Sequence, residues 1–224
     1  GTVQKIAWTR SYLRRSPPPP GGGVVFVDAY DTVFQRPVVV PAESVIFGAD
    51  RVCSPDVCAG PLEAGRRFLN SGTYAGPVDL VADLLDLALA ANWRSHRDSD
   101  QRLLSTTCLE RPTRARLDDV EFAPLDGLDD VADAHFVVVD GRLERHGHGR
   151  PPAVVHGNGP QGKRRLDDLV RSRRLLNGDD PRRAKDDAVV DAAMAHLRVV
   201  ATTSFLDDAG HPRTSDDDDD DDDD

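Results

Sequence analysis

The fold is decided by the stretch Val24-Val25-Phe26-Val27-Asp28-Ala29-Tyr30-Asp31. Its four leading apolar residues follow the turn-forming run Pro17–Gly23. Such a run is typical of a strand buried on both faces of a mainly parallel sheet. Asp28 and Asp31 come directly after it, where open α/β sheets bind their ligands. A carboxylate pair there can hold a divalent cation that faces a diphosphate, although Asp-rich turns are also common.

Outward from this stretch, predicted strands and helices alternate along the chain. The clearest helix covers residues 77–91, because Val78, Val81, Leu84, Leu85 and Ala88 share one face. Further helices are predicted at 3–13, 101–109, 166–176 and 181–200, strands at 44–47 and 153–155, and a hairpin at 135–143 that turns at Asp140-Gly141. This alternation predicts an α/β fold.

Composition restricts the class of protein. The 224 residues carry a net charge of −11, but Asp216–Asp224 supplies nine of the acidic groups, and the rest of the chain carries only −2. Like charges repel, so this run is predicted to be a disordered tail. Arginines alternate with acids and form no basic stripe, which argues against nucleic acid as a partner. No apolar stretch approaches the roughly 18 residues of a membrane span.

Cysteines and the first residues say little about the compartment. Three cysteines, Cys53, Cys58 and Cys108, do not define a disulfide framework. Cys53 and Cys58 flank a turn and can pair in an oxidising compartment, but three free thiols fit equally well. Gly1–Thr9 has neither the charged start nor the cleavage site of a signal peptide.

Two further polar clusters stand at the ends of predicted elements. Asp98-Ser99-Asp100-Gln101 precedes a predicted helix, where Asp and Ser are also ordinary helix caps. His156-Gly157-Asn158-Gly159-Pro160 follows the predicted strand at 153–155. A His that ends a strand before a Gly-rich loop is a candidate metal ligand, and a lone surface His is the alternative.

Taken together, several blocks resemble one known family. The blocks are Gln4-Lys5, Val25–Asp31, Phe47–Asp50 with Pro55, Arg67–Gly72 with Gly76, Asp98–Gln101 and Val154–Pro160. In this order they resemble the glycosyltransferase domain of the procollagen lysyl hydroxylases, over about residues 1–170. The resemblance implies a GT-A type fold, an α/β sandwich with a mostly parallel central sheet that binds a UDP-sugar with Mn²⁺.

The resemblance also implies roles for single residues. By it, Asp28, Asp31 and His156 hold the metal; Lys5, Tyr30, Asn158 and Gly159 contact the nucleotide; and Asn70, Asp100 and Gln101 form the sugar and acceptor side, with Asp100 as the catalytic carboxylate. The donor would be UDP-glucose or UDP-galactose. The acceptor would be a hydroxylysine or glycosyl-hydroxylysine of a collagen-like chain, in the endoplasmic reticulum or secretory pathway.

The sequence departs from the family pattern in three places. Ser99 interrupts a run of aspartates, and Ser54 replaces a tryptophan that could stack on a sugar. No residues before Val3 can supply the first strand that holds uracil and ribose, so we expect an N-terminally incomplete domain at 1–176, a helical extension at 177–215 and the tail at 216–224. We also expect these 224 residues not to include the iron-dependent hydroxylase domain of the animal proteins. A degenerate, inactive domain that binds nucleotide-sugar or collagen-like chains is the main alternative.

Two other motifs suggest other enzymes. His96-Arg97-Asp98 has the His-x-Asp form of a non-haem iron site, which needs a distal His on an all-β scaffold that the predicted helices argue against. Gly157-x-Gly159-x-x-Gly162 matches a dinucleotide fingerprint. A lone match is weak, and no predicted buried strand follows it to carry the ribose-binding acid.

Overall fold

The computed structural model describes residues 3–16, 18–19, 21–29, 31–51, 68–91, 99–110, 114–125, 136–139, 141–145, 149–171 and, for the backbone, 197–202. In chain order the elements are α1 (Val3–Arg15), β1 (Gly23–Asp28), β2 (Thr32–Phe34), β3 (Val45–Asp50), β4 (Phe68–Pro77), α2 (Val78–Ala90), α3 (Asp100–Glu110), β5 (Ala115–Asp118), β6 (Phe122–Pro124), β7 (Phe136–Val139), β8 (Arg142–Arg145), β9 (Val154–His156), α5 (Gly159–Arg171) and β10 (Leu197–Thr202). The fold is α/β, as predicted. Within these ranges no helix has the length and apolar character needed to cross a membrane.

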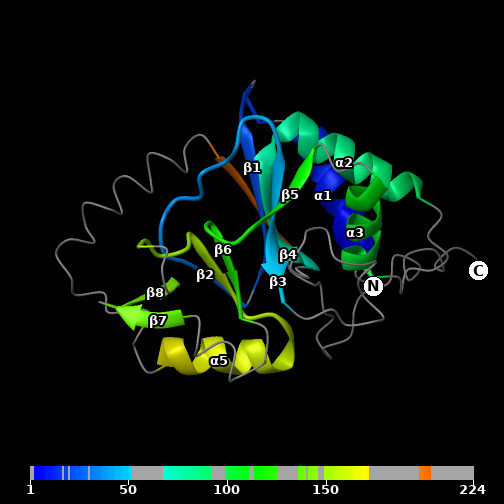
Figure 1. The fold of residues 1–224 in the computed structure, drawn as a ribbon. Coiled ribbons are helices and arrows are strands. Elements are labelled where there is room, and N and C mark those ends of the chain that lie inside the picture. The colour runs from blue at the N-terminus through cyan, green and yellow to red at the C-terminus, as the bar shows by residue number, and fades with distance from the viewer. Residues whose placement is uncertain are drawn as a thin grey trace, which may run out of the picture.

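The main sheet has five strands in the order β10-β1-β4-β3-β5 (Figure 1). β1 pairs in parallel with β10, and β3 pairs in parallel with β5. β4 lies between β1 and β3 and runs antiparallel to both. The predicted mostly parallel sheet is therefore mixed: four strands share one direction, and the central strand β4 opposes them.

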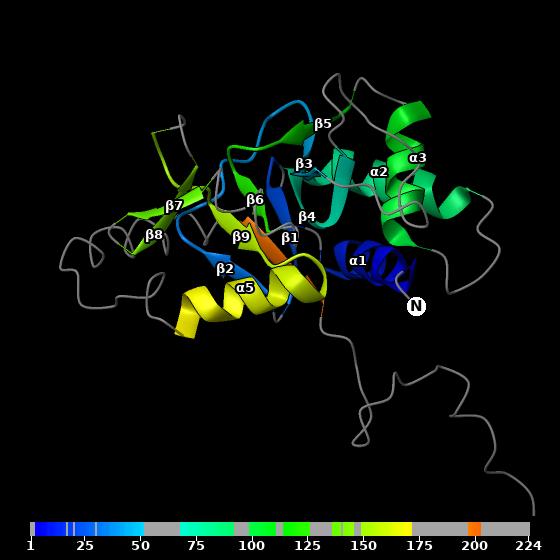
Figure 2. The ribbon, with the colours of Figure 1, turned by 60° about the horizontal axis from the view of Figure 1, so that its bottom comes forward.

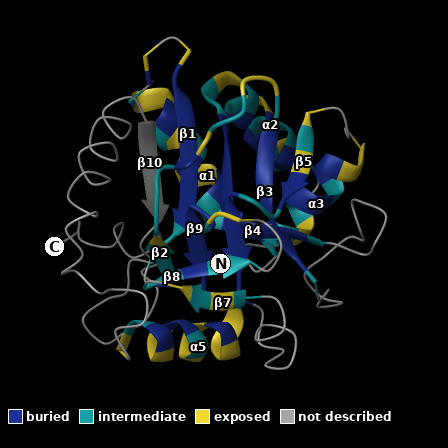
Figure 3. Cartoon of the chain, turned by 60° about the vertical axis from the view of Figure 1, so that its left-hand side comes forward, coloured by how far each residue is buried: buried dark blue, intermediate teal, exposed yellow. Residues whose placement is uncertain are grey.

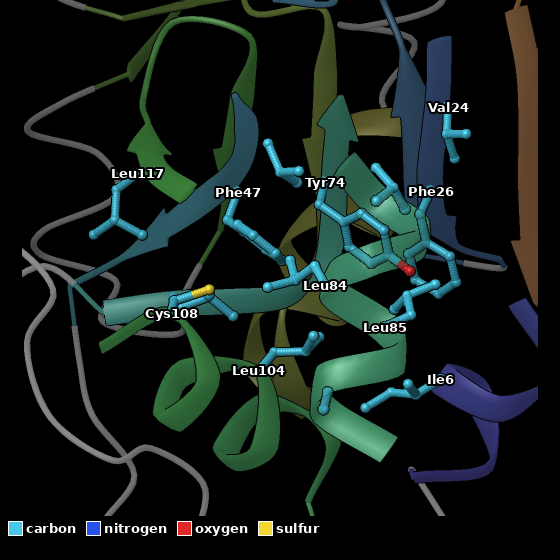
Figure 4. Packing of buried hydrophobic residues seen from close by; sticks show 14 of the residues in the cluster. Ile6, Val24, Phe26, Phe47, Tyr74, Leu84, Leu85, Leu104, Cys108 and Leu117 are labelled. Carbon is cyan, nitrogen blue, oxygen red and sulfur yellow. The ribbon is translucent and has the colours of Figure 1, made fainter. Parts of the chain in front are cut away.

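Alternating side chains of β1 reach the two faces of this sheet, as expected for a strand buried on both sides. Val24 and Phe26 belong to the core cluster on the face covered by α1, α2 and α3. Val25 and Val27 belong to the cluster on the opposite face. On the helix face the ring of Phe26 stacks on Tyr74 of β4, with centroids 4.5 Å apart and planes 6° from parallel (Figure 4). The apolar run therefore fixes β1 between two layers.

The second layer is a small sheet in the order β2-β9-β6, which packs against the main sheet through Phe122 and Val154. Its other face is covered by α5 and carries the β7–β8 hairpin (Figure 2). Leu166 and Leu169 are the buried leucines of α5, while its outer surface is exposed (Figure 3). The layers are thus helices, main sheet, small sheet and α5.

Several predicted elements are confirmed. The helix predicted at 77–91 is α2, with Val81, Leu84, Leu85 and Ala88 buried. The hairpin predicted at 135–143 is β7–β8, and Gly141 in its turn has φ 74°. α5 begins at Gly159, seven residues before the helix predicted at 166–176. The positive φ of Gly159 lets the chain turn there, and Pro160 suits a first helical turn.

The helix predicted at 181–200 is wrong for its last residues. Residues 197–202 form β10, which pairs with β1 from Gly23↔Leu197 to Asp28↔Thr202. They therefore belong to the main sheet and not to a helical extension at 177–215. Val199-Val200 is β-branched and suits a strand, and the edge of β1 offers it backbone hydrogen bonds. Residues 172–196 lie outside the described ranges.

Candidate functional site

The carboxylate pair at the end of β1 lies beside the end of β9. Asp28 is the last residue of β1, and Asp31 comes just before β2. Because β2 pairs with β9, the carbonyl of Asp31 accepts a hydrogen bond from the backbone N–H of Gly157, at 2.7 Å. The side chain of Asp31 is buried, with Oδ1 3.7 Å from Nε2 of the equally buried His156. Tyr30, the predicted nucleotide contact between the two aspartates, lies outside the described residues.

Gly72 brings Asp28 and His156 together. A Cβ at this position in β4 would lie 2.3 Å from Cε1 of His156, 3.0 Å from its Nε2 and 2.9 Å from Oδ2 of Asp28. Any side chain here would push the imidazole and the carboxylate apart. The glycine of the Asn70-Ser71-Gly72 block is therefore required by close approach, and it joins the end of β1 to the end of β9.

Two lysines pair with the two carboxylates. Nζ of Lys5, on α1, lies 2.9 and 3.1 Å from the two oxygens of Asp28 and 3.1 Å from Oδ2 of Asp100. Nζ of Lys163, on α5, lies 3.0 Å from Oδ2 of Asp31. Lys5 is predicted as a nucleotide contact, and the structure places it between a predicted metal ligand and the predicted catalytic carboxylate. Sequence reasoning missed Lys163, which lies seven residues after His156 and three residues beyond the end of the Val154–Pro160 block.

The carboxylates of Asp28 and Asp100 keep the ammonium group of Lys5 protonated. Burial by itself lowers the pKa of the Lys5 ammonium, but Asp100 and Asp28 raise it by more through their charges and hydrogen bonds. The pKa of Lys5 therefore lies above its ordinary value. Lys5 stays protonated at neutral pH and links α1, α3 and β1 at the site.

The charge of Asp31 is held in a similar way from the other side. Burial raises the pKa of the Asp31 carboxyl, whereas His156 and Lys163 lower it by more. The pKa of Asp31 therefore lies below its usual range, and Asp31 is an anion at neutral pH. An ionised, buried carboxylate beside an imidazole is a favourable pair of ligands for a divalent cation.

The predicted acidic run stands at the start of α3. Asp100 is the first residue of the helix and is buried against Lys5. Gln101 follows it and is half-buried. Ser99 accepts a hydrogen bond on Oγ from the backbone N–H of Arg102, at 3.3 Å, and so caps the helix. The serine that interrupts the aspartate run thus has a structural role, and Asp98 lies outside the described residues.

The predicted sugar-side and loop amides meet at a buried carboxylate that sequence reasoning did not select. Nδ2 of Asn70 lies 3.1 Å from each oxygen of Asp50, and Nδ2 of Asn158 lies 3.0 Å from Oδ2. Gly159 follows Asn158 with φ 67°, at the first residue of α5. Asp50 ends β3 and belongs to the Phe47–Asp50 block, so the block contained this residue but gave no reason to choose it.

The predicted metal ligands have the right chemistry but do not form a ready ligand cluster. Among the residues that the structure describes, no group of three or more His, Cys, Asp or Glu side chains stands close enough to hold a metal ion. Oδ1 of Asp31 and Nδ1 of His156 are nevertheless buried without a hydrogen-bond partner. Carboxylate oxygens and an imidazole suit Mn²⁺ as donors. The two carboxylates now bind ammonium groups, so a metal ion would have to replace those contacts.

Comparison with known proteins identifies the family of this chain. The family model described as the PLOD GT domain matches residues 1–171. The chain belongs to this glycosyltransferase domain family. The match includes α1, β1, β4, β9 and α5, the elements that carry the residues above.

Curated relatives carry the same family names at low identity. The chain is 28% identical over 181 residues to a multifunctional procollagen lysine hydroxylase and glycosyltransferase of Caenorhabditis elegans, covering 71% of this chain and 24% of that protein. It is 25% identical over 178 residues to the LH3 enzyme of the same description from Rattus norvegicus, covering 71% and 23%, and 28% identical over 181 residues to procollagen-lysine,2-oxoglutarate 5-dioxygenase 1 of the same animal, covering 71% and 24%. The chain thus spans about a quarter of the length of these relatives.

The two motifs that suggest other enzymes can now be compared with the structure of this PLOD glycosyltransferase domain. His96-Arg97-Asp98, the candidate iron site, lies outside the described residues. In the candidate dinucleotide fingerprint, a Cβ at Gly157 would lie 2.8 Å from the carbonyl oxygen of Gly162, and one at Gly162 would overlap the carbonyl of Leu125. These two glycines therefore allow α5 to pack closely on the strands β6 and β9, which accounts for them without a dinucleotide.

Proposed function

We propose that this domain is a GT-A type, Mn²⁺-dependent hexosyltransferase. It would move glucose or galactose from a UDP-sugar to a hydroxylysine or glycosyl-hydroxylysine of a collagen-like acceptor. The observation that supports this most is the meeting of Asp28 and His156 over Gly72, since it joins two distant sequence blocks at the carboxyl end of β1. Ligands bind at that end in open α/β sheets.

In this proposal Asp28, Asp31 and His156 hold the metal ion. A metal ion held by these residues would supply positive charge against that developing on the departing UDP. The support lies in the residue types and in the unpartnered Oδ1 of Asp31 and Nδ1 of His156. Each carboxylate already binds an ammonium group, which a metal ion would have to displace.

The residues of the chain would then divide the remaining work. Asp100 accepts the proton of the acceptor hydroxyl or stabilises positive charge on the sugar, and Gln101 beside it binds a sugar hydroxyl. Lys5 holds Asp100 next to Asp28, at 3.1 and 2.9 Å. Asn158 and Gly159 shape the loop at the start of α5, where backbone N–H groups can receive the diphosphate. Tyr30 is proposed as a contact of the nucleotide.

The proposed acceptor follows from the relatives, whose names describe procollagen lysine hydroxylases and glycosyltransferases. A procollagen-type acceptor would place the reaction in the secretory pathway. The test is the release of UDP from UDP-glucose and from UDP-galactose with Mn²⁺, with and without a collagen peptide that contains hydroxylysine. We expect peptide-dependent release with at least one donor. No release above background with either donor would contradict the proposal.

A second candidate function is a non-catalytic domain that binds nucleotide-sugar or collagen-like chains. It is favoured by the engagement of both Asp28 and Asp100 by Lys5, and by the capping role of Ser99 in place of a carboxylate. The same assay separates the two candidates. Binding of UDP without release of UDP from either donor is the result expected for a binding domain.

A further inference from the structure

Asp50 is a buried carboxylate that the proposed reaction does not use. It ends β3 and is only 1% exposed. Its oxygens accept hydrogen bonds from the side-chain amides of Asn70, at 3.1 Å to each oxygen, and of Asn158, at 3.0 Å. Burying a carboxylate costs free energy that such charge-assisted hydrogen bonds offset. A buried carboxylate in this position therefore points to a specific role in the structure or the function.

The contacts of Asn70 and of Asn158 with Asp50 form two arms, and the first arm, through Asn70, shapes β4. Asn70 uses both ends of its amide: the nitrogen donates to Asp50, and the oxygen accepts the backbone N–H of Gly72 at 2.9 Å. The pairing of β3 with β4 jumps from Phe47↔Tyr74 to Gly48↔Asn70, so residues 71–73 bulge away from β3. Asn70 therefore holds the bulge that brings Gly72 against Asp28 and His156.

The second arm holds the loop that follows β9. Asn158 lies two residues after His156 and directly before the first residue of α5. Its amide nitrogen donates to Oδ2 of Asp50, which ties this loop to the end of β3. One carboxylate thus holds both the bulge beneath the imidazole of His156 and the loop that leaves it.

We propose that Asp50 is a positioning residue of the site, acting through Asn70 and Asn158 rather than on a substrate. The expected effect on sugar transfer rests on the proposed function, but the hydrogen bonds of Asn70 and Asn158 to Asp50 do not. It also assigns Asn70 a positioning role, because both ends of its amide are engaged within the protein. Sequence reasoning places Asn70 among the sugar-side residues, and the two roles predict different behaviour on substitution.

The chemistry suggests a reciprocal exchange. Asp50→Asn replaces one acceptor oxygen by an NH₂ group that faces the NH₂ of Asn70 or of Asn158, so one hydrogen bond is lost. Asn70→Asp alone sets two buried carboxylates against each other. The double variant Asp50→Asn/Asn70→Asp can keep all the contacts described, because Asn at 50 donates to Asp at 70 and accepts from Asn158, while Asp at 70 still accepts from Gly72.

The experiment measures two properties of the full chain and of these variants. Hydrogen exchange of the segment 68–77 reports the Gly72 amide, and UDP release reports kcat and KM for the donor. We expect Asp50→Asn to speed exchange in this segment and to lower kcat/KM by about 10–100-fold, the usual effect of losing a group that orients a metal ligand. The double variant should restore the slow exchange of the parent chain. Its kcat/KM should return to within about threefold of the parent value, because the two substitutions are expected to couple only with each other.

Glu121→Gln is the matched control. Glu121 is also a buried carboxylate that accepts several hydrogen bonds, but it precedes β6, whose other end pairs with His156. We expect Glu121→Gln to lower stability without changing exchange in 68–77 or KM. If Asp50→Asn does not fold, Asn158→Ala tests the second arm alone, and it should raise KM while exchange in 68–77 stays unchanged.

The outcomes separate the positioning role of Asp50 from the proposed function. Unchanged exchange and kinetics in Asp50→Asn would overturn the proposal, as would an unchanged KM in Asn158→Ala. Recovery of exchange without recovery of transfer in the double variant would also overturn it, because Asn70 would then act on the sugar itself. If the parent chain transfers no sugar, the proposed function fails. The exchange data then test the positioning role of Asp50 alone. Restored protection in the double variant would support this role, and unrestored protection would overturn it.

Discussion

The two flanks of β1 hold its carboxylates in different ways. On the helix flank, Lys5 is mostly buried, with 20% of its side chain exposed, and it bridges Asp28 and Asp100. On the flank of the small sheet, Lys163 is 57% exposed and pairs with Asp31. A buried bridge between two carboxylates fixes their positions, whereas an exposed lysine can exchange its partner with little cost. We infer that the helix flank is rigid and that the other flank can accommodate an incoming group.

The largest effect is expected on the rigid flank, at Asp100. Asp100→Asn keeps the shape of the side chain but cannot act as a base. We predict that UDP release falls by about 10²–10⁴-fold, as for other lost acid–base groups. Binding of UDP with Mn²⁺ should survive, because Asp100 is not among the proposed metal ligands. Retention of transfer within a few-fold of the parent would remove Asp100 from the catalytic role.

The next effect compares the two lysines directly by urea unfolding. Lys5→Met leaves Asp28 and Asp100 facing each other without a cation, and we predict a loss of roughly 2–4 kcal/mol in the free energy of unfolding. Lys163→Met, the matched change on the other flank, should cost less than about 1 kcal/mol because its side chain is exposed. Equal losses for the two variants would contradict the difference between the flanks.

A smaller effect is expected where the flanks meet, at Gly72. In Gly72→Ala the new methyl group would overlap His156 and must displace the imidazole or shift β4. We predict a loss of about 1–3 kcal/mol in stability, the usual cost of overpacking. The affinity for UDP with Mn²⁺ should fall by about tenfold or more. Gly76→Ala is the control, because its Cβ would meet Val45 and Ser44 instead. A change in affinity of equal size in the control would show that the effect is general.

The smallest effect concerns the contact that joins α1 to α2. Nε and Nη2 of Arg10 donate to the two oxygens of Asp86, each at 2.6 Å, and these hydrogen bonds lower the pKa of the Asp86 carboxyl. A lowered folded-state pKa gives stability that is present above about pH 4 and is lost as the pH falls through the folded value. Asp86→Asn should therefore cost at most about 1 kcal/mol at pH 7, since the pair is partly exposed. Unfolding curves that still differ at pH 2 would contradict this account.

The sequence predicted elements well where one local signal was strong. The apolar run before Asp28, the one-sided leucines of α2 and the Asp140-Gly141 turn each identify their element without tertiary information. The predicted site residues that the structure describes come from α1, β1, β4, α3, β9 and the start of α5, with Asp31 between β1 and β2. Asp28 ends β1 and Asp31 follows three residues later, and His156 lies beside Asp31 because β2 pairs with β9.

The sequence failed where neighbours decide the outcome. β4 has the composition of a loop, with an Asn, a Ser and two glycines, and no strand was predicted there. It is a strand because β1 and β3 supply its hydrogen bonds on both sides, and its glycines are needed for close approach to His156 and Val45. Periodicity could not show the pairing of residues 197–202 with β1, since that contact is distant in the chain. Lys163 and Asp50 were missed because their partners come from other segments.

The central proposal is that Asp28, Asp31 and His156 would hold a metal ion when UDP binds. Calorimetric titration of UDP with and without Mn²⁺ tests it most directly, with a chain ending at Ser215 run in parallel to exclude Mn²⁺ bound by Asp216–Asp224. We predict measurable UDP affinity only with Mn²⁺, and loss of this dependence in Asp28→Ala and His156→Ala. Equal UDP binding with and without Mn²⁺, or unchanged binding in Asp28→Ala, would contradict the proposal.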